Sequence, residues 1–271
     1  MGYNGERART VPADPGPTLR EDMAGRAYST EAVVLRTIRL GEADRVLHLY
    51  TEAHGRVGAV AKGVRKTMSR FGGRLEPLSH VELVLHRGRS DLATVTAAQL
   101  LRSHREARED YYRFSVGMIG AEAMLRLFSE EEASEHAFTA LTRFLDLLDI
   151  APHVAERPTL DPLGLAFQLK LLWLAGYLPH VSACAECGAE QEALVGYSTR
   201  AGGAVCTRCA SATEALALAA DGIAGIEALL ARPLADAAGL GLSERAQRDV
   251  LRVIAASYEY HGGFRLRTLS A

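Results

Sequence analysis

Residues 80–86 read His80-Val-Glu-Leu-Val-Leu-His86, in which apolar and polar side chains alternate. Val81, Leu83 and Leu85 would lie on one face of an extended chain and Glu82 on the other, because successive side chains of a strand point to opposite faces. The run therefore predicts a β-strand that buries one face and leaves the other in water.

The same period of two continues on both sides of this run, from Thr30 to Leu101. Turn signals that contain glycine separate the apolar runs. The expected strands are Ala32–Ile38, Arg45–Thr51, Arg56–Lys62, His80–His86 and Leu92–Leu100. Five short strands in so short a span favour a small closed or partly open barrel over a sandwich.

Beyond Ser103 the apolar residues recur every three or four positions, which is the period of an α-helix. The expected helices are the apolar stripes 114–128 and 138–148, a helix that starts with Asp161 and Pro162 and ends at Gly176, and the segments 220–231 and 243–260. Trp173 stands in an apolar helix, so we expect its ring to be buried.

The fold class is thus expected to be α+β with several domains, a barrel followed by a helical region. Residues 1–27 contain several prolines and glycines without an apolar period, which indicates a disordered leader, and translation could start at Met23. The expected barrel domain covers residues 28–102 and the expected α-helical domain covers residues 103–271.

All four cysteines fall into two C-x2-C pairs, Cys184 with Cys187 and Cys206 with Cys209. Such pairs supply four thiolates on two tight turns, as a tetrahedral Zn²⁺ ion requires. We expect one structural zinc ion per chain, bound in a module at residues 184–209. A site with four sulfur ligands leaves no position for a substrate, so function has to be sought elsewhere.

Two other uses of the cysteines remain open. Disulfides or redox pairs are disfavoured, because neither a secretory signal nor a βαβ pattern is recognisable. A zinc-dependent nucleobase deaminase would combine an H-x-E element, such as His80-Val-Glu82 or His104-Arg-Glu106, with one C-x-x-C pair. However, Ala183 stands where that signature has proline, and the second cysteine pair would be idle.

Composition and motifs favour a globular protein without catalytic residues. Of the 271 residues, 48% are hydrophobic, and no apolar run is long enough to span a membrane. Gly58 to Gly63 has the glycine spacing of a P-loop, but Val64 follows where Lys and Ser or Thr should stand. The G-x-S-x-G and H-E-x-x-H motifs are absent. We therefore expect no enzymatic activity.

Positive charge is concentrated in one segment, although the net charge of the chain is −2. Residues 53–75 contain no acidic side chain and six basic ones: Arg56, Lys62, Arg65, Lys66, Arg70 and Arg74. Cations beside barrel strands are how small barrels follow a phosphate backbone, and Phe71 in the same segment could stack on a base. The alternative is a solvated charged loop.

Several of these runs also occur together in one known family. They are Glu31–Leu35, Leu40–Arg45, Tyr50–Arg56, Ala61–Lys66 with Ser69-Arg70, the four-cysteine module after a helical segment, and the late Tyr260-His261. On these residues the chain resembles the RecO family of bacterial recombination mediators, from Tyr28 to its C-terminus.

The resemblance implies an OB-fold barrel, a helical domain that carries the zinc module, and binding and annealing of single- and double-stranded DNA. It also implies that RecR and single-stranded DNA-binding protein are partners in loading recombinase, in the cytoplasm at the bacterial nucleoid. By position it indicates Arg36, Arg39, Lys62, Arg65, Lys66, Arg70 and Arg74 as DNA contacts. An adaptor that binds only proteins through the barrel is the alternative.

Overall fold

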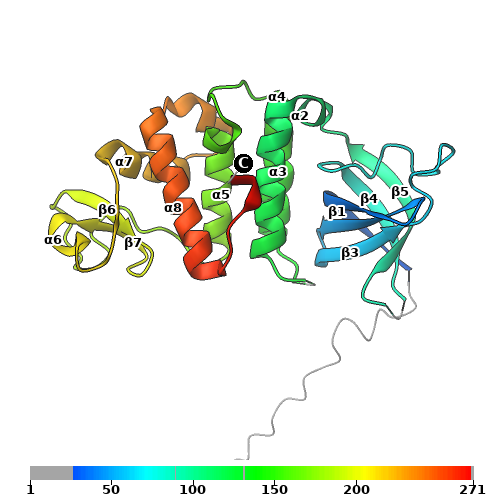
Figure 1. Ribbon diagram of the computed structural model, residues 1–271, viewed down its shortest axis with the longest axis horizontal. Coiled ribbons are helices and arrows are strands. Elements are labelled where there is room, and N and C mark those ends of the chain that lie inside the picture. Colours follow the sequence, from blue (N-terminus) through cyan, green and yellow to red (C-terminus); the bar gives the residue numbers. More distant parts are fainter. Residues whose placement is uncertain (1–26, 89, 131, 270–271) are drawn as a thin grey trace, which may run out of the picture.

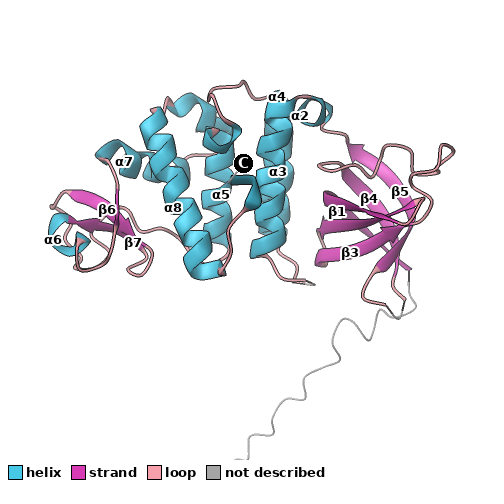
Figure 2. Ribbon diagram, viewed as in Figure 1, coloured by secondary structure: helices cyan, strands magenta, loops and turns pink. Residues whose placement is uncertain are grey.

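The computed structural model describes residues 27–88, 90–130 and 132–269. Figure 1 shows a β-barrel at one end, helices in the middle and a small sheet at the opposite end. The expected leader and Met23 lie outside the described residues, apart from Ala27, which begins the first strand. Strands thus occupy the two ends of the molecule, and the helices lie between them (Figure 2).

The barrel consists of β1 (Ala27–Leu40), β2 (Asp44–Thr51), β3 (Gly55–Ala61), β4 (His80–His86) and β5 (Ala93–Arg102). These strands close in the order β1-β2-β3-β5-β4. Neighbours pair antiparallel, except that β3 and β5 pair in parallel over a short register. All five strands correspond in place and order to the expected ones.

Strand β1 closes the barrel, because it pairs with β2 along one edge and with β4 along the other. Its register with β2 shifts between Val34 and Arg36, which marks a β-bulge. Around this bulge the strand contributes to two cores: Val34 packs inside the barrel, whereas Val33 and Leu35 pack among the helices. Tyr50 of β2 also belongs to the helical core.

The helical region comprises α2 (Arg105–Glu109), α3 (Tyr111–Leu127), α4 (Glu135–Ile150), α5 (Pro162–Leu174), α7 (Ala220–Ala231) and α8 (Glu244–Gly262), with the 3-10 helices η1 (Pro158–Leu160), η2 (Leu234–Leu240) and η3 (Arg267–Leu269). Helix α5 lies between α3 and α8 (Figure 1) and is buried along almost its whole length. It begins as expected, with Pro162 in the first turn and the Asp161 carboxylate accepting a hydrogen bond from the Gly164 amide at 3.1 Å.

The expectation that Trp173 is buried is wrong, because 55% of this residue is exposed. Trp173 stands in the last turn of α5, where the helix leaves the core. There it borders an open groove of about 730 Å³ that Leu147, Leu174 and Leu234 also line. An apolar helix therefore does not bury every one of its side chains.

The cysteine module is a small sheet of β6 (Leu194–Ser198), β7 (Gly203–Cys206) and β8 (Leu216–Ala217) in the order β7-β6-β8, with the short helix α6 (Thr207–Ala210). These strands were not expected from the sequence. Within the part of the chain that the structure describes, no helix has both the length and the apolar character needed to cross a bilayer.

Candidate functional site

The connection between β3 and β4, residues 62–79, covers the inner core of the barrel, and we call it the cap. Val64, Phe71 and Leu75 of the cap belong to the cluster of side chains that fills the barrel. These three residues are 8%, 1% and 1% exposed, respectively, so the segment that carries them is not a loose loop. The cap is therefore a structured part of the barrel.

The cations of the cap lie on its other side. Lys62, Arg65, Lys66, Arg70 and Arg74 are all exposed. Basic and buried apolar residues are neighbours in the chain, since Arg65 follows Val64, Phe71 follows Arg70, and Leu75 follows Arg74. The cap thus buries an apolar side in the barrel and presents a basic side to solvent.

The first cations of the cap lie beside the turn between β1 and β2. The Arg65 amide donates to the Ala43 carbonyl at 2.9 Å, and its guanidinium donates to the Gly41 carbonyl at 3.3 Å. The Gly63 amide donates to the Asp44 carboxylate at 2.7 Å. Arg39 near the end of β1 is exposed and has Arg45 as its strand partner, so it lies close to the same turn.

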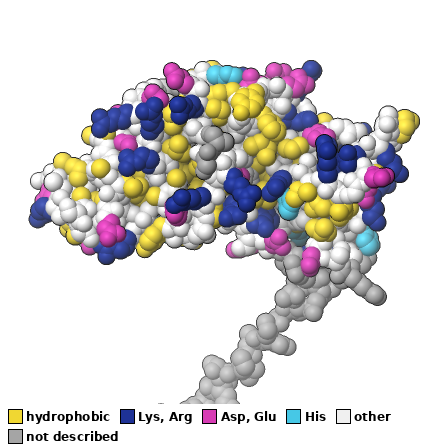
Figure 3. All heavy atoms as spheres, in the orientation of Figure 1, with side chains coloured by type: hydrophobic (Ala, Val, Ile, Leu, Met, Phe, Trp, Pro, Cys, Tyr) yellow, Lys and Arg dark blue, Asp and Glu magenta, His cyan; other side chains and the backbone are white. Residues whose placement is uncertain are grey.

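The later cations of the cap lie nearer to β5. Arg70 donates to the Val95 carbonyl at 3.5 Å, and its guanidinium carbon is 4.7 Å from the centre of the Phe71 ring. Arg74 donates to the Arg70 carbonyl at 2.8 Å. The cap therefore carries two groups of cations, one at the β1–β2 turn and one beside β5. In Figure 3, Lys and Arg side chains gather along the outer edge of the barrel.

The proposed stacking role of Phe71 is contradicted by its burial. Only 1% of this residue is exposed, and its ring packs in the barrel core. A base could reach the ring only if the cap left the barrel. Phe71 therefore anchors the cap and does not form part of the outer surface.

Arg56 was grouped in the sequence analysis with the basic residues expected to follow a phosphate backbone. In the structure its guanidinium binds other groups of the protein. It donates to the Leu125 and Phe128 carbonyls at the end of α3, and forms an ion pair with Glu130 at 3.0 Å. Only 24% of its side chain is exposed. Arg56 thus connects β3 to α3, and its guanidinium is engaged by groups of the protein itself.

Arg36 is exposed on the outer face of β1, apart from the cap, and its strand partner is His48. Burial, and then the charges of Arg36 and Arg56, lower the pKa of His48 below its ordinary value, although Glu130 opposes this shift. His48 was missed by the sequence analysis. The signal was weak, because a lone histidine in a strand has no motif around it.

The outer face of β1, β2 and β3 was missed as well. Ile38, Val46 and Val60 are partners across these strands, and Ile38 is 42% exposed. Part of this face is covered by α3, whereas this row remains accessible. An apolar row next to Arg36 is thus a further part of the candidate surface.

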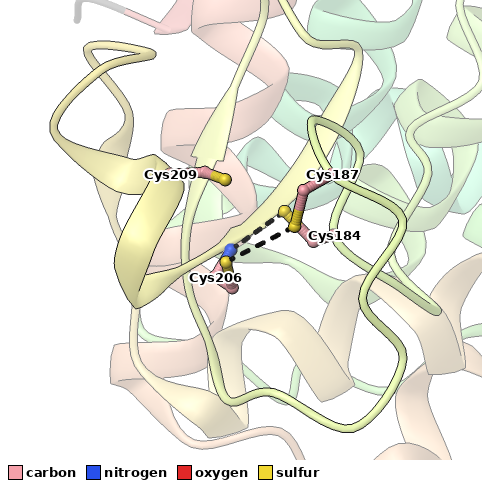
Figure 4. A group of neighbouring side chains, drawn as sticks. All are labelled: Cys184, Cys187, Cys206 and Cys209. Carbon is pink, nitrogen blue, oxygen red and sulfur yellow. Dashed lines mark hydrogen bonds between the residues drawn. The ribbon is translucent and has the colours of Figure 1, made fainter.

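The four cysteines come together at the opposite end of the molecule, as their spacing predicted. Figure 4 shows Cys184, Cys187, Cys206 and Cys209 around one point, and their sulfur atoms all lie within 4.8 Å of one another. Four thiolates at about 2.3 Å from a tetrahedral zinc ion would be about 3.8 Å apart. The Cys187 and Cys206 sulfurs are 3.9 Å apart, so the donor set and its size fit this ion.

Backbone amides support the first cysteine. The Cys206 amide donates to the Cys184 sulfur at 3.3 Å. Burial opposes ionisation of the Cys184 thiol, but hydrogen bonds from the amides of Cys206, Cys187 and Glu186 outweigh it and lower its pKa to about 6. A thiol that ionises readily is a suitable metal ligand.

The described residues do not support a deaminase site. The cysteine cluster contains four sulfurs and no histidine among the residues that the structure describes. The two candidate H-x-E histidines lie elsewhere: His80 binds Glu31 at 2.9 Å, and His104 binds the Leu78 carbonyl and Asp146. A catalytic zinc site needs an open position, which four thiolates would close.

Comparison with known proteins gives matches over nearly the whole chain. The family model "Recombination protein O N terminal" matches residues 23–104, and the model "Recombination protein O C terminal" matches residues 108–270. Among curated relatives, the DNA repair protein RecO of Rubrobacter xylanophilus is 38% identical over 82% of this chain and 89% of the relative. The proteins of the same name from Frankia casuarinae and a Nocardioides species are 39% and 42% identical, over 89% and 67% of this chain and 96% and 74% of their own lengths.

Proposed function

The chain belongs to the RecO family, and we propose that it is a non-enzymatic, DNA-binding mediator of recombination in DNA repair. In this proposal the barrel is an OB-fold that binds single- and double-stranded DNA and anneals complementary strands. The contacts are Lys62, Arg65, Lys66, Arg70 and Arg74 of the cap, together with Arg36 and Arg39 of β1.

The observation that carries the proposal is the two-sided cap. Its apolar side holds the segment on the barrel, so its cations are presented by a structured surface and lose less conformational freedom on binding than those of a mobile loop. Cations held in this way can follow a phosphate backbone without reading the sequence.

The lack of exposed aromatic rings among the described residues of the barrel supports the annealing activity in particular. The described residues between Ala27 and Arg102 include three aromatic rings of Phe, Tyr or Trp, on Tyr28, Tyr50 and Phe71, and none of these residues is exposed. Many proteins that bind single strands stack the bases on exposed rings. A surface that binds phosphates and has no such ring would leave the bases free to pair with a second strand.

The partners in this proposal come from the family resemblance. With RecR, the protein would help to load recombinase on single strands coated by single-stranded DNA-binding protein, in the cytoplasm at the nucleoid. Neither partner is assigned to a surface.

The metal centre in this proposal is structural. One zinc ion per chain is held by Cys184, Cys187, Cys206 and Cys209, and the ion supplies folding free energy to the module. The sulfur positions support this assignment. DNA binding belongs to the barrel at the other end of the molecule.

The test compares two double variants across a salt series. Lys62→Ala/Lys66→Ala removes two exposed cations that have no hydrogen-bond or ion-pair partner among the described residues. Arg232→Ala/Arg245→Ala removes two exposed cations of the helical region and is the matched control. If four to six cations bind phosphates, log K against log salt should have a slope of about −3 to −4 on single-stranded DNA.

We expect the cap variant to reduce this slope by about 1.4 and the affinity by about 20-fold at 0.1 M salt, and the control to change neither. The loss should be equal for unrelated DNA sequences, and strand annealing should slow in parallel. An affinity that does not depend on salt in the unmodified protein would indicate an adaptor that binds only proteins. A loss confined to one DNA sequence would exclude backbone binding as the mechanism.

A further inference from the structure

His104 lies where the barrel meets the helices. It is 3% exposed and directly precedes α2, with a left-handed backbone at a φ of 42°. Its Nδ1 is 2.8 Å from the Leu78 carbonyl oxygen, and its Nε2 is 3.0 Å from a carboxylate oxygen of Asp146 in α4. One buried ring therefore links the end of the cap to the helical region.

The two partners of this ring determine where its protons are. A backbone carbonyl and an ionised carboxylate can only accept hydrogen bonds. Both contacts are satisfied together only if both ring nitrogens carry a hydrogen, which is the imidazolium form. The charge is balanced by Asp146, which is the charged group in contact with the ring.

The part of the cap that His104 holds is inserted into the helical core. Leu78 has a left-handed backbone at a φ of 68°, and its side chain is fully buried in the cluster formed by the helices. Its amide donates to the Val34 carbonyl of β1 at 2.8 Å. Just before it, Glu76 forms an ion pair with Arg45 of β2 at 2.8 Å. The position of Leu78 thus fixes where the later half of the cap leaves the barrel.

We propose that His104, held as an imidazolium, is a latch that fixes the cap on the helical region and so positions the cap cations for DNA. The role in DNA binding rests on the proposed function, whereas the latch itself does not. His104 acts through Leu78 and is a positioning residue. Removing one of its protons would break one of the two hydrogen bonds and free the end of the cap.

Two other ionisable groups near the latch, Asp149 and His80, have partners of their own. Asp149 of α4 accepts a hydrogen bond from the Ala107 amide at 2.8 Å. His80 of β4 binds Glu31 of β1 at 2.9 Å; burial lowers the pKa of His80, although the charge of Glu31 and the hydrogen bond to it oppose this shift. Arg102 of β5 lines the same small cavity as His104 and both aspartates.

The first experiment detects the protons directly in the full chain. Nitrogen-15 NMR of the histidine rings at pH 7, with His104 assigned by its loss in His104→Asn, should show two protonated nitrogens for this ring. Asparagine is the chosen replacement because it tolerates a left-handed backbone. A single protonated nitrogen at pH 7 would overturn the proposal, whether or not the variant folds well.

The second experiment measures what the latch does. Hydrogen exchange at the Leu78 amide should be about tenfold faster in His104→Asn than in the unmodified protein, and unchanged in the control His136→Asn, whose histidine is exposed on α4. Equal protection in both proteins would refute the latch.

DNA affinity completes the test. His104→Asn should bind single-stranded DNA about threefold to tenfold more weakly than the unmodified protein at pH 7. If exchange changes while affinity does not, the latch exists but does not position the cap. If the unmodified protein does not bind DNA, the proposed function fails, and the exchange and NMR results still decide about the latch.

Discussion

Arg56 and Lys62 are close in the sequence but have opposite surroundings. The Arg56 guanidinium is bound by two carbonyls at the end of α3 and by Glu130, whereas Lys62 is exposed and has no such partner among the described residues. A basic residue in the sequence therefore adds positive charge to the surface only where the fold leaves its side chain without an ionic partner.

We expect Arg56→Ala to lower the free energy of unfolding by about 2 kcal/mol, because it leaves partly buried carbonyls without their charged donor. The measurement is urea unfolding at pH 7. The salt slope of DNA binding should stay within error of the unmodified value. A slope reduced as much as in Lys62→Ala/Lys66→Ala would mean that Arg56 contacts DNA after all.

Glu122 should make stability depend on pH. Burial raises the pKa of its carboxyl, but hydrogen bonds from the Thr268 hydroxyl and the amides of Arg267 and Thr268 outweigh burial and lower the pKa below its ordinary value of 4.5. A lowered folded-state pKa contributes stability above the ordinary pKa, and this contribution is lost as the pH falls through the folded value.

The unmodified protein should therefore be more stable than Glu122→Gln at pH 7, and the difference should shrink as the pH falls below 4.5. Urea unfolding of both proteins from pH 7 to pH 3 measures this difference. A difference that does not change with pH would show that the carboxylate charge plays no part in holding the C-terminal segment.

At the scale of an element, α3 approaches the barrel through a glycine. A Cβ atom at position 117 would lie 2.5 Å from Leu78 Cδ1 and 3.3 Å from Leu148 Cδ2. Gly117→Ala should lower the free energy of unfolding by about 1–3 kcal/mol, because neither neighbour is free to move.

Gly225→Ala in α7 is the matched control. Its Cβ would meet its nearest neighbour at 3.5 Å, which is ordinary contact. We expect this variant to be unchanged or up to about 1 kcal/mol more stable, since alanine is the better helix former. Thermal and urea unfolding of both variants provide the comparison. Equal effects would mean that close packing of α3 on the cap is not what requires glycine.

The strands and helices were predictable because their periodicity is local. His80–His86 alternates as the barrel requires, and α5 starts at the predicted Asp161 and Pro162. The cysteine cluster was predictable because two short spacings contain most of its geometry.

The structure of the cap and the surroundings of Phe71 and Arg56 depend on contacts between segments that are far apart in the chain. Residues 62–79 have no helix or strand period, and Phe71 is buried because the barrel interior accepts its ring. The partner carbonyls of Arg56 are 69 and 72 residues away in the chain. No pattern within either segment indicates these contacts, so both residues were assigned to DNA.

At the scale of the whole molecule, the metal module and the barrel lie at opposite ends (Figure 1). Removing zinc should therefore unfold the module and leave DNA binding largely intact. We expect about one zinc per chain by elemental analysis, and after chelation faster hydrogen exchange in residues 184–209 but not in the barrel.

Cys184→Ser should reproduce the effect of chelation, and Ser211→Ala, an exposed site in the same module, should not. Loss of DNA affinity in proportion to lost zinc, with the barrel still folded, would show that the module contributes directly to the DNA surface. A module equally protected with and without metal would contradict the structural role.

Val33, Leu35, Tyr50 and Leu78 come from the N-terminal segment but are buried in the cluster that the helices form. A fragment that stopped at Arg102 would return these four side chains to water, at a cost of about 1.5–3 kcal/mol each. Such a fragment should be prone to aggregation, whatever its affinity for nucleic acid. Experiments on separate fragments would therefore underestimate the activities of the intact protein. These activities have to be mapped by point substitutions in the intact chain.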